Sequence, residues 1–405
     1  MTRLERKKVT SSMSTQQIRL PIGGPIVTRT FYALGALAVL SGALLLWRFV
    51  FGIGRVTALN DGYPWGLWIA FDVVVGTALA TGGYVVAILI YVLNRGHYHP
   101  LVRSALVTSG LGYALGGFGV LIDLGRYWNV YKVPTMFWRW NLNSVLLEVA
   151  LCITAYTAVV WVELAPSFLD KWKSSPNKKL GEVSAKAYKL IEWSLPWLIA
   201  LGVLLPTMHQ SSLGSLMMIA GIKLHPLWNT PILPLLFLLS CVGMGFAAVV
   251  VESVLSSGAF KRPFETDLLR PLSRVIGIVL WIYLIIRVAD LALRGRLGLA
   301  LSLDRYSLLF LVELTLFVVP AVMLSRRKAI QKLRYLFTGA ALMLAAGALY
   351  RFSTFLIAFN PGQGWRYFPA TTELLVTVGL VSAEIIAYIA IVKRFPILVG
   401  ATRKK

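Results

Sequence analysis

The sequence predicts an all-α, polytopic membrane protein with about ten transmembrane helices. Hydrophobic residues make up 57% of the 405 residues and charged residues only 14%. The mean hydropathy is +0.72, which means more apolar surface than a soluble core can bury. Apolar runs recur along the chain, each long enough to cross a hydrocarbon core of about 30 Å as a helix. These observations exclude a soluble enzyme, a nucleic-acid-binding protein and a secreted disulfide-linked domain.

The apolar runs follow one another with short connections. The polar, basic segment before the first run lacks the layout of a cleaved signal peptide. We therefore expect a basic tail at 1–29, a transmembrane domain at 30–398 and a second basic tail at 399–405. Within the domain, membrane-spanning helices are expected at 31–51, 65–94, 101–127, 143–165, 189–209, 231–257, 271–294, 302–325, 332–359 and 371–397.

The basic charge predicts the orientation of the chain. Lys and Arg number 40 against 17 Asp and Glu, a net charge of +23. In a soluble protein this balance would suggest nucleic acid as a partner. Here most basic residues fall in both tails and in alternate connections, which is the bias expected of cytoplasmic segments. Both termini are therefore predicted to be cytoplasmic, and no nucleic acid is expected as a partner.

Cysteine and histidine are scarce. Cys152 and Cys241 lie in separate apolar runs, so the chain cannot hold an iron–sulfur cluster alone. A haem held by two histidines needs a facing pair on different helices. His97 and His99 share a connection and His225 follows His209 into the next one, so we expect no haem. No cluster of ligands predicts a metal site either.

Several ionisable residues lie within the predicted spans, where each needs a partner or a function. Asp72, Asp123, Glu148 and His209 are expected near the outer ends of four consecutive spans. Arg126 lies three residues after Asp123 and is expected to pair with it. These groups form either a set of helix-orienting ion pairs or one polar pocket near the outer surface, and their recurrence on four helices favours the pocket.

Deeper residues suggest a route for protons. Tyr113 and Glu252 lie on the way to the predicted inner surface, and together with Asp72 and Glu148 they could relay protons. For Glu252 a purely structural role is equally open. Other deep charges are expected to pair structurally: Arg287 with Asp290, and Arg351 with Glu313 or Glu384.

The predicted outer connections are rich in Trp and Tyr. They include 62–68, 126–140 and 365–368. Such residues are typical of the aromatic belt at a membrane interface, and a docking surface for a partner is the alternative. Gly112 and Gly116 form a G-x-x-x-G pattern that predicts close packing of two helices.

Longer stretches resemble a known family. The chain is similar to the NrfD/polysulfide-reductase family of membrane subunits, and within it to the hydrogenase-2 branch, from about residue 30 to 398. The stretches that carry the resemblance are GYPWGLWIAFDVVVGTALATGGY (62–84), NRGHYHPLVR (94–103), GYALGGFGVLIDLGRYWN (112–129), NLNSVLLE (141–148), LLPTMHQSSLGSLM (204–217), HPLW (225–228) and AFNPGQGWRYFP (358–369).

The resemblance implies a quinone-reactive anchor in the bacterial inner membrane, without haem or metal of its own and not catalytic alone. In the hydrogenase branch, a periplasmic ferredoxin-like iron–sulfur subunit passes electrons to menaquinone from the small and large nickel–iron hydrogenase subunits. The family's acidic and histidine positions map here onto Asp72, Asp123, Glu148, His209 and Glu252, with Tyr113 on the same path.

The leading hypothesis is electron transfer from an iron–sulfur partner to quinone within this membrane complex. His209 and Asp123, the latter held by Arg126, are expected to bind the quinone headgroup. Asp72 and Glu148 are expected to supply protons, and Glu252 and Tyr113 would make the inner side their source. The alternatives are a membrane subunit of another quinol-linked reductase (polysulfide, nitrite or sulfite), an ion-coupled transporter, and a passive anchor.

Overall fold

The computed structural model describes residues 21–173 and 175–398. The regular secondary structure within them is helical, apart from one isolated bridge between Leu224 and Phe359. Ten of the described helices are long and apolar enough to cross a membrane, which confirms the predicted fold class. They are α2 (Arg29–Phe51), a second span over Trp68–Val92, a third over Gly96–Asp123, α7 (Val145–Lys173), α8 (Lys178–Ile219), α9 (Leu233–Ala259), α10 (Thr266–Leu293), α12 (Arg305–Ser325), a ninth over Leu333–Ile357 and α14 (Thr371–Arg394).

Two faces of the bundle can be named from the predicted orientation. The predicted outer face carries the connections 52–67, 124–144, 220–232, 294–304 and 358–370. The predicted inner face carries the alternate connections and the beginning of α2 and end of α14. Residues 1–20 and 399–405, which hold most of the first expected tail and all of the second, lie outside the described residues.

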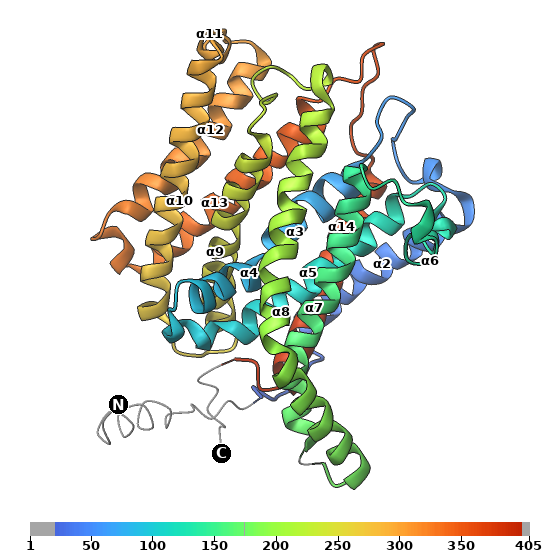
Figure 1. Ribbon diagram of the computed structural model, residues 1–405, viewed down its shortest axis with the longest axis vertical. Helices are drawn as coiled ribbons and strands as arrows, with labels where there is room; N and C mark the ends of the chain where they lie inside the picture. Colours follow the sequence, from blue (N-terminus) through green and yellow to red (C-terminus); the bar gives the residue numbers. More distant parts are fainter. Residues whose placement is uncertain (1–20, 174, 399–405) are drawn as a thin grey trace.

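The second span is irregular and lies at the centre of the bundle (Figure 1). It consists of the π-helical η2 (Trp68–Val75), α3 (Gly76–Leu79), α4 (Gly82–Ala87) and the π-helical η3 (Ile88–Val92). In its most apolar stretch 78% of the residues are buried, against 17% for α2, which faces the surroundings. π-Helical turns are frequent at functional sites, and here they place Asp72 inside the protein.

The helix α5 (Val102–Asp123) packs against this central span through glycines. A Cβ on Gly112 would lie 2.5 Å from Cβ of Ala80, and one on Gly116 would lie 2.8 Å from Cγ2 of Thr77. The structure therefore confirms the close packing that the G-x-x-x-G pattern predicts.

The helix α8 is much longer than the expected span 189–209. Its 42 residues extend over roughly 63 Å, so it exceeds the thickness of a bilayer. Figure 1 shows the α7–α8 hairpin projecting from the bundle. Hydropathy marks only the apolar part of a helix, whereas its hydrogen bonds continue into polar sequence. His209 therefore lies ten residues before the end of α8, deeper than the sequence suggested.

The helices α2 and α14 are the long helices nearest the two ends of the described chain, and they lie side by side. The Ser41 hydroxyl on α2 donates to the Val376 carbonyl on α14 at 3.0 Å. Beside them, the backbone N–H groups of Ile22 and Gly23 donate to carbonyls at the end of α14. The first and last spans thus form one packed pair.

The helices α9, α10, α12 and α13 (Leu333–Phe352) pack together as a second group. The expected pair between Arg287 and Asp290 is not formed there. Asp290 binds Arg294 at 2.6 Å, one turn further along α10. Arg287 points inward instead, where it donates to the Leu227 carbonyl at 2.9 Å. An i, i+4 neighbour reaches Asp290 as readily as an i, i+3 neighbour, and Arg294 at the helix end is the more exposed of the two arginines, so its pair with Asp290 keeps more contact with water.

Candidate functional site

Three buried or partly buried carboxyls meet near the predicted outer face. They are Asp72 on η2, Asp123 at the end of α5 and Glu373 in the first turn of α14, and we call them the outer carboxyl cluster. Electrostatic interactions link Asp123 with both of the others. The Thr377 hydroxyl donates to Oδ2 of Asp72 at 3.1 Å. The structure therefore brings together two of the residues expected in the pocket.

Glu373 is fully buried and well satisfied. It accepts hydrogen bonds from the backbone N–H of Ala58 at 2.9 Å and of Ala370 at 2.7 Å. It also accepts one from the Tyr367 hydroxyl. Burial, and then this bond, raise the pKa of Tyr367 above its usual value, so Tyr367 remains a donor at neutral pH. These contacts anchor the beginning of α14 to the connections on the outer face.

Asp123 does not pair with Arg126 in the structure. The helix α5 ends at Asp123, so the chain leaves the helical path before Arg126, which is exposed. The cation beside Asp123 is Arg48 of α2, whose Nε donates to the Ile122 carbonyl at 2.7 Å and whose Nη2 donates to the Leu124 carbonyl. Arg48 is fully buried, and it satisfies the negative end of α5.

Deeper in the bundle lies a chain of neutral polar groups around a buried arginine. We call it the His209 cluster: Thr77, His209, Gln210, Ser240 and Arg351. Nη2 of Arg351 donates to Oε1 of Gln210 at 3.1 Å, and Nη1 donates to Oγ of Ser240 at 3.1 Å. Nε2 of Gln210 donates in turn to Oγ1 of Thr77 at 3.1 Å. The expected pairing of Arg351 with Glu313 or Glu384 is therefore wrong, because Arg351 faces α8 and α9 instead.

The hydrogen bonds of Thr77 assign the protons of His209. The single hydroxyl proton of Thr77 goes to the Val73 carbonyl, at 2.6 Å. Nε2 of His209 lies 3.0 Å from the same oxygen, so Nε2 must carry the hydrogen and donate. Nδ1 is then an unprotonated acceptor. It is buried and has no hydrogen-bond partner among the described residues.

Other buried polar atoms in this region share that feature. Buried polar groups in proteins are almost always hydrogen-bonded, so each exception asks for an explanation. Tyr113 packs its ring 5.7 Å from that of His209 and 4.4 Å from that of Tyr156, and its hydroxyl is unpartnered. Unpartnered atoms within the described residues here are Nη1 of Arg48, Oδ1 of Asp72, the hydroxyl of Tyr113, Oδ1 of Asp123 and Nδ1 of His209.

The remaining expected residues lie apart from these clusters. Glu148 is half-buried in the first turn of α7, and its carboxyl forms no ion pair or hydrogen bond with described residues. Glu252 lies near the predicted inner face, where it accepts a hydrogen bond from the Tyr388 hydroxyl. Sequence reasoning missed Arg48, Thr77 and Glu373. A single arginine inside the first apolar run was the clearest available signal.

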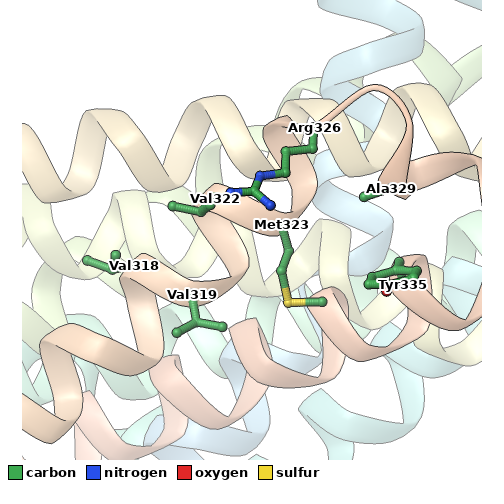
Figure 2. A pocket seen from close by; sticks show the side chains of 7 residues that line it. All are labelled: Val318, Val319, Val322, Met323, Arg326, Ala329 and Tyr335. Carbon is green, nitrogen blue, oxygen red and sulfur yellow. The ribbon is translucent and has the colours of Figure 1, made fainter.

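A groove elsewhere on the surface does not belong to this site. It has a volume of about 280 Å³ and lies along α12 and the beginning of α13 (Figure 2). Valine and methionine line most of it, with Arg326 and Tyr335 at one end. None of the candidate residues reaches it.

Comparisons with known proteins agree with the resemblance seen in the sequence. Residues 55–360 match the family described as polysulphide reductase, NrfD. The chain is 43% identical, over 93% of its own length and 94% of the relative's, to the probable Ni/Fe-hydrogenase 2 b-type cytochrome subunit of Escherichia coli K12. It is 29% identical to the integral membrane subunit of menaquinone reductase of Nitratidesulfovibrio vulgaris, over 59% of this chain and 56% of that protein. A selenate reductase subunit of Mesobacillus selenatarsenatis is 24% identical over 64% of this chain and 63% of its own.

The first of these relatives corrects one expectation. Its name is that of a b-type cytochrome subunit, which implies haem, so the expectation that no haem is present is wrong. That expectation considered only pairs of histidines. In the structure His209 binds Thr77, His225 stacks on Tyr306, and the other two histidines lie in η4 (Gly96–Leu101). These four histidines form no facing pair, so they do not by themselves fit a haem held by two histidines.

The match covers most of the chain and agrees with the ten apolar helices. The similarity to the Escherichia coli protein extends over nearly the whole length of this chain. This chain therefore belongs to the NrfD family and is a multi-pass protein of the bacterial inner membrane.

Proposed function

We propose that this chain is the quinone-reactive membrane subunit of a nickel–iron hydrogenase complex. It would pass electrons from an iron–sulfur partner at the predicted outer face to menaquinone. The names of two relatives, a hydrogenase subunit and a menaquinone reductase subunit, support the assignment. The observation that carries it is the set of buried polar atoms without partners on α2, η2, α5 and α8.

A quinone headgroup suits these atoms chemically. Its reduction consumes two electrons and two protons, and its two oxygens change from acceptors into hydroxyl donors. A protonated Asp72 or Asp123 could donate to a quinone oxygen, and Nδ1 of His209 could accept from the hydroxyl that forms. General acid–base groups of this kind typically contribute about 100-fold or more to a rate.

The position of the outer carboxyl cluster fits an external electron donor. The cluster lies beside the connections of the predicted outer face, which expose large aromatic side chains. These include Trp128, Tyr131, Trp138 and Phe368. In the proposal an iron–sulfur subunit, joined to the small and large hydrogenase subunits, docks on this face. Arg126 is exposed there, while Arg48 takes the place beside Asp123 that the sequence assigned to Arg126.

The remaining residues have proposed roles in proton supply. Asp72 lies within the outer carboxyl cluster and is its direct proton donor, and Glu148 at the beginning of α7 would be the entry point for protons taken from the outer side. Two further residues would carry protons taken from the predicted inner side. They are Tyr113, whose ring packs against that of His209, and Glu252, which lies near the predicted inner face.

The test is quinone reduction by the purified complex with its native partner subunits. Hydrogen and a reduced viologen serve as alternative electron donors, and the appearance of menaquinol is followed optically. Asp72→Asn and Glu148→Gln remove a titratable proton with little change of shape. We expect Asp72→Asn to slow the reaction by roughly 100-fold at unchanged assembly, and Glu148→Gln to do so only where protons enter from the outer side. The exposed Glu182→Gln is the matched control and should be as active as the original protein.

Each other outcome has a definite meaning. If the intact complex reduces menaquinone with neither donor, the proposed function is wrong. Full activity of Asp72→Asn would remove the outer carboxyl cluster from the mechanism. Activity with viologen but not with hydrogen would assign the chain to another quinol-linked reductase, of the kind that the selenate reductase relative represents.

A further inference from the structure

One face of α14 carries polar groups along most of its length. Glu373, Thr377, Glu384 and Tyr388 are spaced by 4, 7 and 4 residues. At about 100° per residue these side chains fall within a sector of roughly 60°. At 1.5 Å per residue they extend over roughly 22 Å, most of the thickness of the hydrocarbon core.

The outer half of this face touches the outer carboxyl cluster. Glu373 is a member of the cluster, and Thr377 donates to Asp72. Asp72 is 1% exposed, and its other oxygen, Oδ1, is unpartnered within the described part of the chain. A proton on Asp72 would therefore be next to the proposed quinone position.

Glu384 occupies the middle of the face. Its Oε1 lies 3.5 Å from the place where a Cβ on Gly112 would be, so the glycine of α5 leaves room for the carboxyl. Asp72 interacts electrostatically with Glu384. The carboxyl of Glu384 forms no hydrogen bond or ion pair with the described residues. A carboxyl at membrane depth without such a partner is costly, which marks it as functional by default.

The inner half of the face leads to the predicted inner surface. The Tyr388 hydroxyl, one turn from Glu384, donates to Oε1 of Glu252. Glu252 interacts electrostatically with Glu265, in the connection between α9 and α10. The side chain of Glu265 is 18% exposed and lies 3.9 Å from Arg262. The series thus ends in contact with water.

We propose that this face of α14 conducts protons from the predicted inner face to the outer carboxyl cluster, with Glu384 as the central carrier. The inference rests on the proposed function, because quinone reduction consumes the protons at the cluster. A proton passes from Glu265 and Glu252 to Tyr388, then to Glu384 and Asp72. For each quinone, two electrons arrive from the iron–sulfur partner and two protons arrive by this route, giving one quinol.

The contrast between two glutamates on the same face supports a mobile role for Glu384. Glu373 accepts three hydrogen bonds from fixed donors, so it anchors the helix. Glu384 is bound by none of the described residues, so its side chain can turn towards Tyr388 on one side and Asp72 on the other. Thr377, which contacts Asp72, and Glu384 are separated by roughly 10 Å along the helix axis. In the proposal, rotation of the Glu384 side chain together with water carries the proton over this distance.

The test measures on which side protons are consumed. The native complex is sealed into proteoliposomes that contain a pH-sensitive dye, menaquinone, valinomycin and K⁺. A reduced, membrane-impermeant sulfonated viologen is added outside, so that only complexes with the partner outward react. Quinol formation and internal pH are recorded together. We expect about two internal protons consumed per quinol, as the reaction requires, and at least a tenfold slower internal alkalinisation for Glu384→Gln. Glu182→Gln should behave as the original protein.

The outcomes separate this inference from the proposed function. If no quinol forms in the original complex, the proposed function fails. Quinol formed without internal alkalinisation refutes the route alone, as does an unchanged rate of internal alkalinisation in Glu384→Gln. If Glu384→Gln assembles but stops turnover altogether, Glu384→Asp decides. Recovery with the shorter carboxylic acid supports proton transfer, and equal inactivity means that Glu384 is structural.

Discussion

At the scale of single residues, three arginines are buried inside the membrane domain without a carboxylate within ion-pair distance among the described residues. Arg48, Arg287 and Arg351 instead donate to backbone carbonyls and neutral side chains of other segments of the chain. The planar guanidinium has five donors, so it can be satisfied by several weak acceptors converging from different helices. Each of these arginines therefore links its own helix to another segment of the bundle, which an ion pair on a single helix would not do.

Replacing Arg48 should destabilise the protein. Arg48→Gln is too short to reach both carbonyls at the end of α5, and hydrogen bonds from charged groups contribute about 1.5–3 kcal/mol each. We expect a loss of at least about 2 kcal/mol, seen as a lower midpoint of thermal unfolding in detergent. The exposed Arg55→Gln should leave the midpoint unchanged. Equal midpoints for both variants would show that Arg48 adds nothing to stability.

The sequence predicted which residues are chemically unusual better than it predicted their partners. Asp72 and Asp123 do meet, as expected, because both lie near the same ends of neighbouring spans. The Asp123–Arg126 pair failed because the i, i+3 rule holds only while the helix continues, and α5 stops at Asp123. Arg48 and Glu373 come from spans distant in sequence, and no local pattern reveals such contacts.

At the scale of elements, close contact between α5 and the central span depends on particular glycines. A methyl group on Gly112 would meet the rigid Cβ of Ala80 at 2.5 Å, whereas one on Gly117 would lie 3.4 Å from Cγ2 of Ile153. Only the second distance is an ordinary contact. The central span is also irregular here, so it has few ways to move away.

The two glycines should therefore respond oppositely to the same substitution. Gly112→Ala should destabilise the protein by about 1–3 kcal/mol, the usual effect of overpacking. Gly117→Ala should be neutral or stabilise it by up to about 1 kcal/mol, since alanine favours helix. Thermal unfolding in detergent compares them directly. A similar loss for both variants would mean that helix α5 does not depend on this contact.

Element boundaries show what hydropathy can and cannot predict. All ten spans were expected within a few residues of their apolar cores, because the bilayer dictates the length of an apolar run. The polar extensions of α8 and the breaks in the central span were not expected. Hydropathy marks neither of them: in the first, the helical hydrogen bonds continue into more polar sequence, and the second is a change in backbone hydrogen bonding within an apolar run.

At the scale of the whole molecule, the distribution of basic residues predicts the orientation. Cys152 and Cys241 are buried, so a new exposed cysteine can be labelled selectively. Ser302→Cys lies on the predicted outer face and Lys179→Cys on the predicted inner one, and both positions are exposed. In intact spheroplasts a membrane-impermeant maleimide should label Ser302→Cys alone, and lysis should make Lys179→Cys reactive. The reverse pattern would invert the orientation.

The pairing of α2 with α14 also has a consequence for synthesis. Among the ten described spans, α2 leaves the ribosome before the others and α14 after them, so α2 stays in the bilayer without its partner until α14 is inserted. Until then Glu384 and Tyr388 do not exist in the membrane. If α14 carries the protons, a chain that is still being synthesised or that lacks α14 has no complete proton route. Such a chain therefore cannot leak protons across the membrane by this route.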